Sequence, residues 1–179
     1  ECEAHVVELE AWWGERGPDK ITAFVFESAE QKGEYMGASG TNIAKPWRGE
    51  GYIQGTQFPH RVLGHELMHV IASSRGEGPF QVGAHWGGLL PNPGLIEGVA
   101  VAASPKEEDL SAAEWAKAMR DRGTLPPLDA LLGLRFFTAS SSMAYTASGA
   151  FVGWIHARFG NDAVRAWYGG SSLEDATGV

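Results

Sequence analysis

The first third of the chain alternates between helical and extended patterns of apolar residues. Val6, Leu9 and Trp13 recur at helical spacing, which predicts a helix over residues 5–13 that ends at the following glycine. Beyond it, β-branched and aromatic residues between glycine-containing turns predict short strands. These strands span residues 21–27, 34–38 and 51–56. The pattern therefore indicates one helix followed by a small sheet.

From residue 60 onward the pattern is mainly helical. Val62, Met68 and Ile71 belong to a wide apolar surface on a helix predicted over residues 60–73. A passage rich in glycine and proline separates this helix from a second apolar helix over 94–103. Capping signals and apolar spacing then predict helices over 111–122, 126–133, 144–159 and 162–168, and the opening of another at 172–175.

Length and composition fit a single globular domain. The chain has 179 residues, of which 44% are hydrophobic. This is enough for residues 1–179 to form one domain with its own buried core. The formal net charge is -8, and Lys and Arg are not clustered, which argues against DNA or RNA as a partner. We interpret the acidity as a contribution to solubility and not as selection of a basic substrate.

Cysteine usage and hydropathy restrict the remaining classes. Cys2 is the only cysteine, so a disulfide within the chain and a CxxC metal site are both excluded. No apolar run reaches the roughly 20 residues of a membrane helix, so we expect a soluble domain without membrane insertion. The sequence starts at Glu1 without methionine and stops soon after the capping pattern at 172–175. We therefore expect the chain to be part of a longer protein. Whether that protein is extracytoplasmic or tethered to a membrane stays open.

One segment of the predicted helix 60–73 carries a metal-binding motif. His65-Glu66-Leu67-Met68-His69 is an HExxH sequence. On a helix, residues four apart lie about 5–6 Å from each other at Cβ, so two imidazole nitrogens can meet one cation. Glu66 follows the first histidine directly, where it can reach a water molecule without binding the metal. The motif therefore predicts His65 and His69 as ligands and Glu66 as the general base.

A catalytic zinc ion needs a third protein ligand. Glu97 is the best candidate, because it is a lone charge among apolar and small residues on a helix that should be buried. A buried carboxylate is stable when a cation compensates its charge. Gly98 should let this helix approach the HExxH helix closely. His60 and His85 are the competing third ligands, and a Glu97 that is merely solvated at a helix edge is the other alternative.

These residues resemble a known family. The HELMH segment, followed by Gly94-Leu95-Ile96-Glu97-Gly98-Val99-Ala100, is similar to the gluzincins, zinc metallopeptidases of the HExxH...E type, and especially to small domains related to their aminopeptidase branch. The segment from Ala144 to Gly160 resembles a later helix of that group. The similarity covers residues 60–170, and its two specific parts are HELMH and the Leu-Ile-Glu-Gly piece.

The resemblance implies a fold, a cofactor and further site residues. The fold would be zincin-like and α+β, with a small mixed sheet, an active-site helix and a mostly helical C-terminal part. One zinc ion would be held by His65, His69 and Glu97. Tyr145 would donate a hydrogen bond to the oxyanion of the tetrahedral intermediate. The strand at 51–56 would form the sheet edge above the cleft and pair with an extended peptide.

Two features depart from the family pattern. The chain has no Gly-Ala-Met-Glu-Asn element, which in the related aminopeptidases binds the free amine of the substrate, so aminopeptidase specificity is not predicted. Val101 stands four residues after Glu97, where thermolysin-like enzymes have an aspartate, so the carboxylate that would orient a ligand imidazole is not identified.

The expected function is zinc-dependent cleavage of a peptide or protein substrate, with Glu66 accepting a proton from water and passing it to the leaving amine. The alternative is a catalytically inactive zinc-binding or scaffolding module of a larger protein. The presence of Glu66 counts against this alternative, because an inactive module does not need a general base. Glu66 and His69 also fit the ExxH motif of di-iron bundles, but those need two such motifs on long helices. A single non-haem iron is a further option that fits the HExxH motif less well than hydrolysis does.

Overall fold

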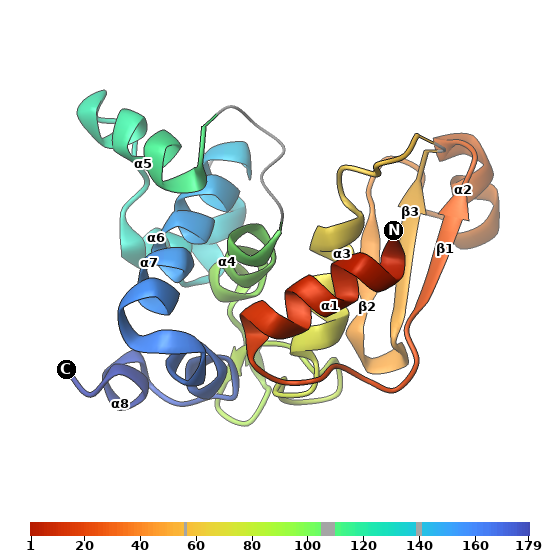
Figure 1. Ribbon diagram of the computed structural model, residues 1–179. Coiled ribbons are helices and arrows are strands. Elements are labelled where there is room, and N and C mark those ends of the chain that lie inside the picture. Colours follow the sequence, from red (N-terminus) through yellow and green to blue (C-terminus); the bar gives the residue numbers. More distant parts are fainter. Residues whose placement is uncertain (56, 105–109, 139–140) are drawn as a thin grey trace.

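The protein has an α+β fold, as predicted, in which a small sheet occupies one end and a group of helices the other (Figure 1). The computed structural model describes residues 1–55, 57–104, 110–138 and 141–179. The N-terminus lies near the sheet, and the C-terminus lies on the far side of the helical group (Figure 1). Within these residues, no helix has both the length and the hydropathy needed to cross a bilayer.

A mixed three-stranded sheet forms the first part of the chain. Its strands are β1 (Thr22–Phe26), β2 (Ile43–Lys45) and β3 (Glu50–Gln54), in the order β1-β3-β2. β1 runs parallel to β3, and β2 runs antiparallel to it. The predicted strands at 21–27 and 51–56 correspond to β1 and β3; Thr56, the last residue of the second prediction, lies outside the described residues.

The predicted strand at 34–38 is wrong. This segment belongs largely to a helix, α2 (Ala29–Met36), which ends at Gly37 with a left-handed φ of 72°. The Ser28 side chain accepts a hydrogen bond from the backbone N–H of Gln31 and so caps the start of the helix. This cap and the glycine that ends the helix favour helix locally. The strand that pairs with β3 on its other side is β2, which the sequence pattern did not predict.

The helix that carries the HExxH motif lies between the sheet and the C-terminal helices (Figure 1). This helix, α3 (Leu63–Ala72), is buried along most of its length. Its apolar side chains, including Leu67 and Met68, share one core with Leu9 of α1 (Cys2–Trp13) and Ile53 of β3. Because both sides of α3 are packed, the motif is held in a fixed position.

The C-terminal helices follow the prediction closely. Asn92 caps α4 (Pro93–Ala103), and Ser111 and Glu114 form the predicted capping box of α5 (Ala112–Asp121). A left-handed Gly160, with φ 84°, interrupts α7, so its two halves match the two helices predicted at 144–159 and 162–168. The elements from α6 on are α6 (Leu128–Leu131), η2 (Leu134–Thr138), α7 (Ser141–Tyr168) and α8 (Leu173–Thr177).

The glycines of α4 pack against the later helices, which corrects the expectation for Gly98. A Cβ at Gly98 would lie 2.8 Å from the carbonyl oxygen of Ser148 on α7. At Gly94, a Cβ would lie 2.0 Å from the carbonyl oxygen of Leu131. The missing side chains therefore allow close approach to α6 and α7, and not to α3. Glu97 lies on a different side of α4, as its contacts with α3 show.

Candidate metal centre

The two histidines of the motif converge because α3 is helical from Leu63 onward. His65 and His69 lie one turn apart on the same side of this helix. Their Nε2 atoms are 3.2 Å from each other, and the two rings are nearly perpendicular, with 86° between their planes. His69 is buried and His65 is partly exposed to the cleft. The sequence prediction that the two rings meet is confirmed.

Glu97 completes the cluster from α4. Its Oε2 atom lies 3.1 Å from Nε2 of His65 and 3.5 Å from Nε2 of His69. Among the described residues, these three form the group of His, Cys, Asp and Glu side chains whose geometry suits a metal ion. The carboxylate thus lies next to the histidine rings and is not merely solvated at a helix edge.

The dimensions of the cluster fit one tetrahedral metal ion. Nitrogen and oxygen ligands at about 2.0–2.1 Å from a tetrahedral zinc ion lie ~3.3 Å from each other. The sides of the triangle formed by the three donor atoms are 3.1, 3.2 and 3.5 Å. Two imidazoles and one carboxylate are also the donor set of one class of catalytic zinc site, which leaves a fourth position open. The three residues therefore fit such an ion in number, type and spacing.

Electrostatics keep Glu97 in the form that binds a metal. Burial by itself raises the pKa of this carboxyl group, but hydrogen bonds and charge interactions with His65 and His69 outweigh burial and lower the pKa to about 2. Glu97 is therefore ionised at neutral pH. A carboxylate must be ionised to act as a metal ligand, so no proton has to be removed from it when a metal binds.

Glu66 lies beside the cluster without belonging to it. Only 7% of this residue is exposed, and its side chain contributes to the cleft that contains the histidines. Burial raises the pKa of Glu66 to about 7, and the charge of Glu97 acts in the same direction. The charges of His65 and Lys32 oppose this shift. The first turn of α3 thus presents a buried carboxyl group next to the triangle of donors.

Tyr145 enters the same cleft from the first turns of α7. Its ring lies 6.3 Å from the ring of His65, and its hydroxyl group lies in the electrostatic field of the Glu97 carboxylate. Burial first, and then the influence of Glu97, raise the pKa of Tyr145 to about 12. The hydroxyl group is therefore protonated at neutral pH and can donate. Tyr145 thus lies in the same cleft as His65 and Glu97, and its expected role as a donor to the oxyanion stays a prediction.

Comparisons of the chain with protein-family models, curated proteins and solved structures find no match. The resemblance to gluzincins therefore stays an expectation from the sequence.

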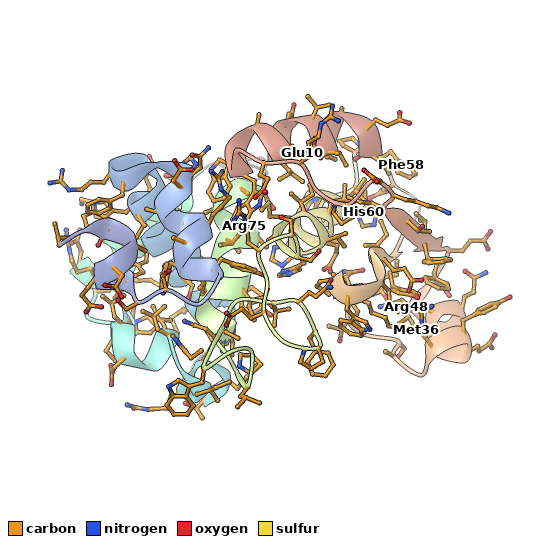
Figure 2. The ribbon with its side chains drawn as sticks, turned by 90° about the horizontal axis from the view of Figure 1, so that it is seen from below. Glu10, Met36, Arg48, Phe58, His60 and Arg75 are labelled. Carbon is orange, nitrogen blue, oxygen red and sulfur yellow. The ribbon has the colours of Figure 1, made fainter. Side chains whose placement is uncertain are left out.

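The competing third ligands lie elsewhere. Nε2 of His60 lies 3.1 Å from the carbonyl oxygen of Gln54, and its backbone N–H donates to Glu1 at the start of α1. His60 accordingly lies next to α1 in Figure 2. His85, in the short strand β4 (Ala84–His85), lies 3.3 Å from the side chain of Asn92. Neither ring joins the triangle of donors.

The site opens into a cleft of about 810 Å³. Residues of the segment 40–47, which includes β2, form one wall. Ile96, Val101 and Tyr145 contribute to the cleft from α4 and α7, and α3 contributes the motif. β3 is the central strand of the sheet, so the expectation that it forms the edge above the cleft is wrong. The edge strands are β1 and β2, and it is β2 that lines the cleft. Its three residues gave too short a pattern to predict.

Sequence reasoning missed Lys32. This side chain from α2 is fully buried, and its Nζ donates a hydrogen bond to the carbonyl oxygen of Thr41 in the cleft wall. Burial lowers the pKa of Lys32, while the negative charge of Glu66 opposes that shift. A lysine in a segment without a predicted helix gives no signal of burial, because lysine is mostly an exposed residue. Trp47 and Arg61 also line the cleft and were not predicted to do so.

Proposed function

We propose that the chain is a zinc-dependent hydrolase that cleaves peptide bonds. The observation that carries this proposal is the triangle of donor atoms from His65, His69 and Glu97, with Glu66 beside it in one open cleft. A structural zinc site is normally closed by four protein ligands, whereas three ligands leave a position for water or substrate. The neighbouring carboxyl group favours hydrolysis over metal storage, because hydrolysis needs a proton acceptor near the attacking water.

Each residue of the site has a separate role in the proposed hydrolysis. His65, His69 and Glu97 would hold zinc, which when bound supplies a Lewis acid and acidifies water. The Glu66 carboxylate accepts the proton of the attacking water and then delivers it to the nitrogen of the leaving amine. The hydroxyl group of Tyr145 donates a hydrogen bond to the oxygen that becomes negatively charged in the transition state. Each step needs a group that lies in the same cleft.

An extended peptide is the substrate that suits this cleft. β2 pairs with β3 on one side only, and two of its three residues line the cleft. The backbone groups on its free side can pair with a peptide that lies along the cleft, as an added strand. Such pairing would hold the substrate backbone between β2 and the donor triangle. The edge strand β2 therefore takes the role that we first expected for residues 51–56.

Element analysis together with an activity assay tests the proposal. We expect the purified protein to bind about one zinc ion per chain, and to cleave members of a mixed peptide pool. Glu66→Gln should keep the zinc and the fold but lose activity by about two to four orders of magnitude. His65→Ala and His69→Ala should lose stoichiometric zinc. Zinc-loaded wild-type protein that cleaves no member of the pool would contradict the peptidase function and favour a zinc-binding module.

A further inference from the structure

The cleft combines one charged centre with largely neutral walls. Glu66 and Glu97 are the acidic residues that line the described part of the cleft, and Arg61 is the Lys or Arg residue that lines it. The walls around this centre contain large apolar side chains. They are Ile43, Pro46, Trp47, Val62, Val82, Ile96 and Val101. Ligand sites of this kind select a substrate by fitting its apolar groups, while a few polar groups fix its orientation.

Trp47 is the largest apolar side chain in this lining. It belongs to η1 (Pro46–Arg48), a single turn between β2 and β3, and 42% of the residue is exposed. Arg48, the next residue, lies at the sheet end of the molecule in Figure 2. An indole ring in a cleft offers a large, rigid apolar surface to a bound group. Trp47 thus presents such a surface on the side of the cleft formed by the sheet.

Phe80 supports the ring of Trp47 from a different part of the chain. The segment between α3 and α4 carries Phe80, whose ring packs edge-on against Trp47 with 5.2 Å between ring centroids and 71° between planes. About half of Phe80, 52%, is also exposed. Edge-to-face packing fixes the orientation of an aromatic pair. The contact therefore holds the indole ring in place while it leaves part of both rings uncovered.

The segment that contains Phe80 carries no charge that could recognise a charged substrate. Between Glu77 and Glu97 the sequence has no Asp, Glu, Lys or Arg. This stretch also contributes Val82 and Ile96 to the cleft. In a chain in which 20% of the residues are charged, such a stretch next to a ligand cleft points to contacts with apolar groups.

We propose that Trp47, supported by Phe80, forms a subsite for one bulky apolar side chain, so that the cleft selects peptides with an aromatic or large aliphatic residue near the cleaved bond. The inference rests on the proposed peptidase function for its link to cleavage. The binding preference itself follows from the aromatic pair and the neutral walls. It can therefore be measured separately from catalysis.

A pair of blocked pentapeptides tests the subsite. One consists of alanine only and the other has phenylalanine at its centre; both are titrated into zinc-saturated Glu66→Gln protein by calorimetry. We expect the phenylalanine peptide to bind at least about tenfold more tightly, a discrimination that an apolar pocket can supply. Trp47→Ala should reduce this preference to less than about threefold, and Trp47→Phe should retain most of it because an aromatic face remains.

Trp86→Ala is the matched control. Trp86 is 79% exposed and does not line the cleft, so its removal should leave the preference unchanged. Thermal unfolding of every variant establishes that it is folded. Equal binding of the two peptides, absence of binding to either, or an unchanged preference in folded Trp47→Ala protein would each overturn the proposal.

Cleavage of the mixed pool by wild-type protein separates this inference from the peptidase function. Cleavage sites with large apolar residues enriched at one position support both. Cleavage without any such enrichment overturns the subsite and leaves the peptidase function standing. A Trp47-dependent binding preference without any cleavage supports the subsite and contradicts the peptidase function.

Discussion

Replacing Glu66 by glutamine should change how the stability of the metal-free protein depends on pH. Burial raises the pKa of Glu66 from an ordinary value of 4.5 to about 7. The folded chain therefore binds this proton more tightly than the unfolded chain does. The stabilisation that this proton contributes is complete below pH ~4.5 and is lost as the pH rises through about 7. Glutamine cannot ionise, so the variant should not show this loss.

The difference between the two pKa values sets the magnitude. One pKa unit is a tenfold change in proton affinity and is worth ~1.4 kcal/mol. The rise of the Glu66 pKa from 4.5 to about 7 therefore corresponds to about 3 kcal/mol in the free energy of unfolding. The stability of Glu66→Gln relative to wild type should therefore increase by about 3 kcal/mol between pH 4.5 and pH 8. For a chain of this length, such a change corresponds to ~6–12 °C in the midpoint of thermal unfolding.

Urea denaturation of the chelator-treated proteins at several pH values measures this effect. Glu34→Gln is a suitable control, because Glu34 is exposed on α2 and its charge is already solvated in the folded protein. Parallel stability profiles of wild type and Glu66→Gln across this pH range would refute the conclusion that a buried carboxyl group at position 66 resists ionisation. A relative stability that decreases toward pH 8 would refute its sign.

Three further predictions concern the ligands, the hydroxyl donor and the packing of α4. Glu97→Gln should weaken zinc binding by at least ~100-fold, because replacing even a residue that only orients a metal ligand lowers metal affinity by about 10–100-fold. Competition with a chromophoric chelator measures the zinc affinity. Tyr145→Phe should lower kcat by ~10²–10³-fold with zinc content unchanged, as expected when one donor to the oxyanion is removed; unchanged kcat would exclude Tyr145 from that role. Gly94→Ala should destabilise the protein by about 1–3 kcal/mol, because its Cβ would overlap the carbonyl oxygen of Leu131; denaturant unfolding tests it.

The sequence predicted best those parts of the site in which local geometry decides the outcome. His65 and His69 meet because four residues make about one turn of α3, and this spacing is readable without a structure. Glu97 could be selected because a lone carboxylate in an apolar helix needs a compensating charge. The first of the two predicted helices ends just before Gly160 and the second begins just after it, which matches the interruption of α7.

The predictions that failed overlooked a local helix cap or depended on contacts between separate segments. Tyr35 and Met36 looked like strand residues, but the cap at Ser28 makes the segment helical. Three residues of β2 become a strand through pairing with β3, which no local pattern shows. The burial of Lys32 likewise depends on the carbonyl oxygen of Thr41, in the segment that follows α2. The sequence therefore predicted that His65, His69 and Glu97 come together, but not the cleft wall formed by residues 40–47.

The close packing of α4 against α7 fixes the rotation of α4 about its own axis. Gly98 faces α7, and Glu97, about 100° away around the helix, faces the histidines of α3. A larger residue at position 98 must turn or displace α4 and carry the carboxylate with it. Substitutions on the reverse side of this helix could therefore shift the Glu97 carboxylate relative to His65 and His69 without replacing any of these three residues.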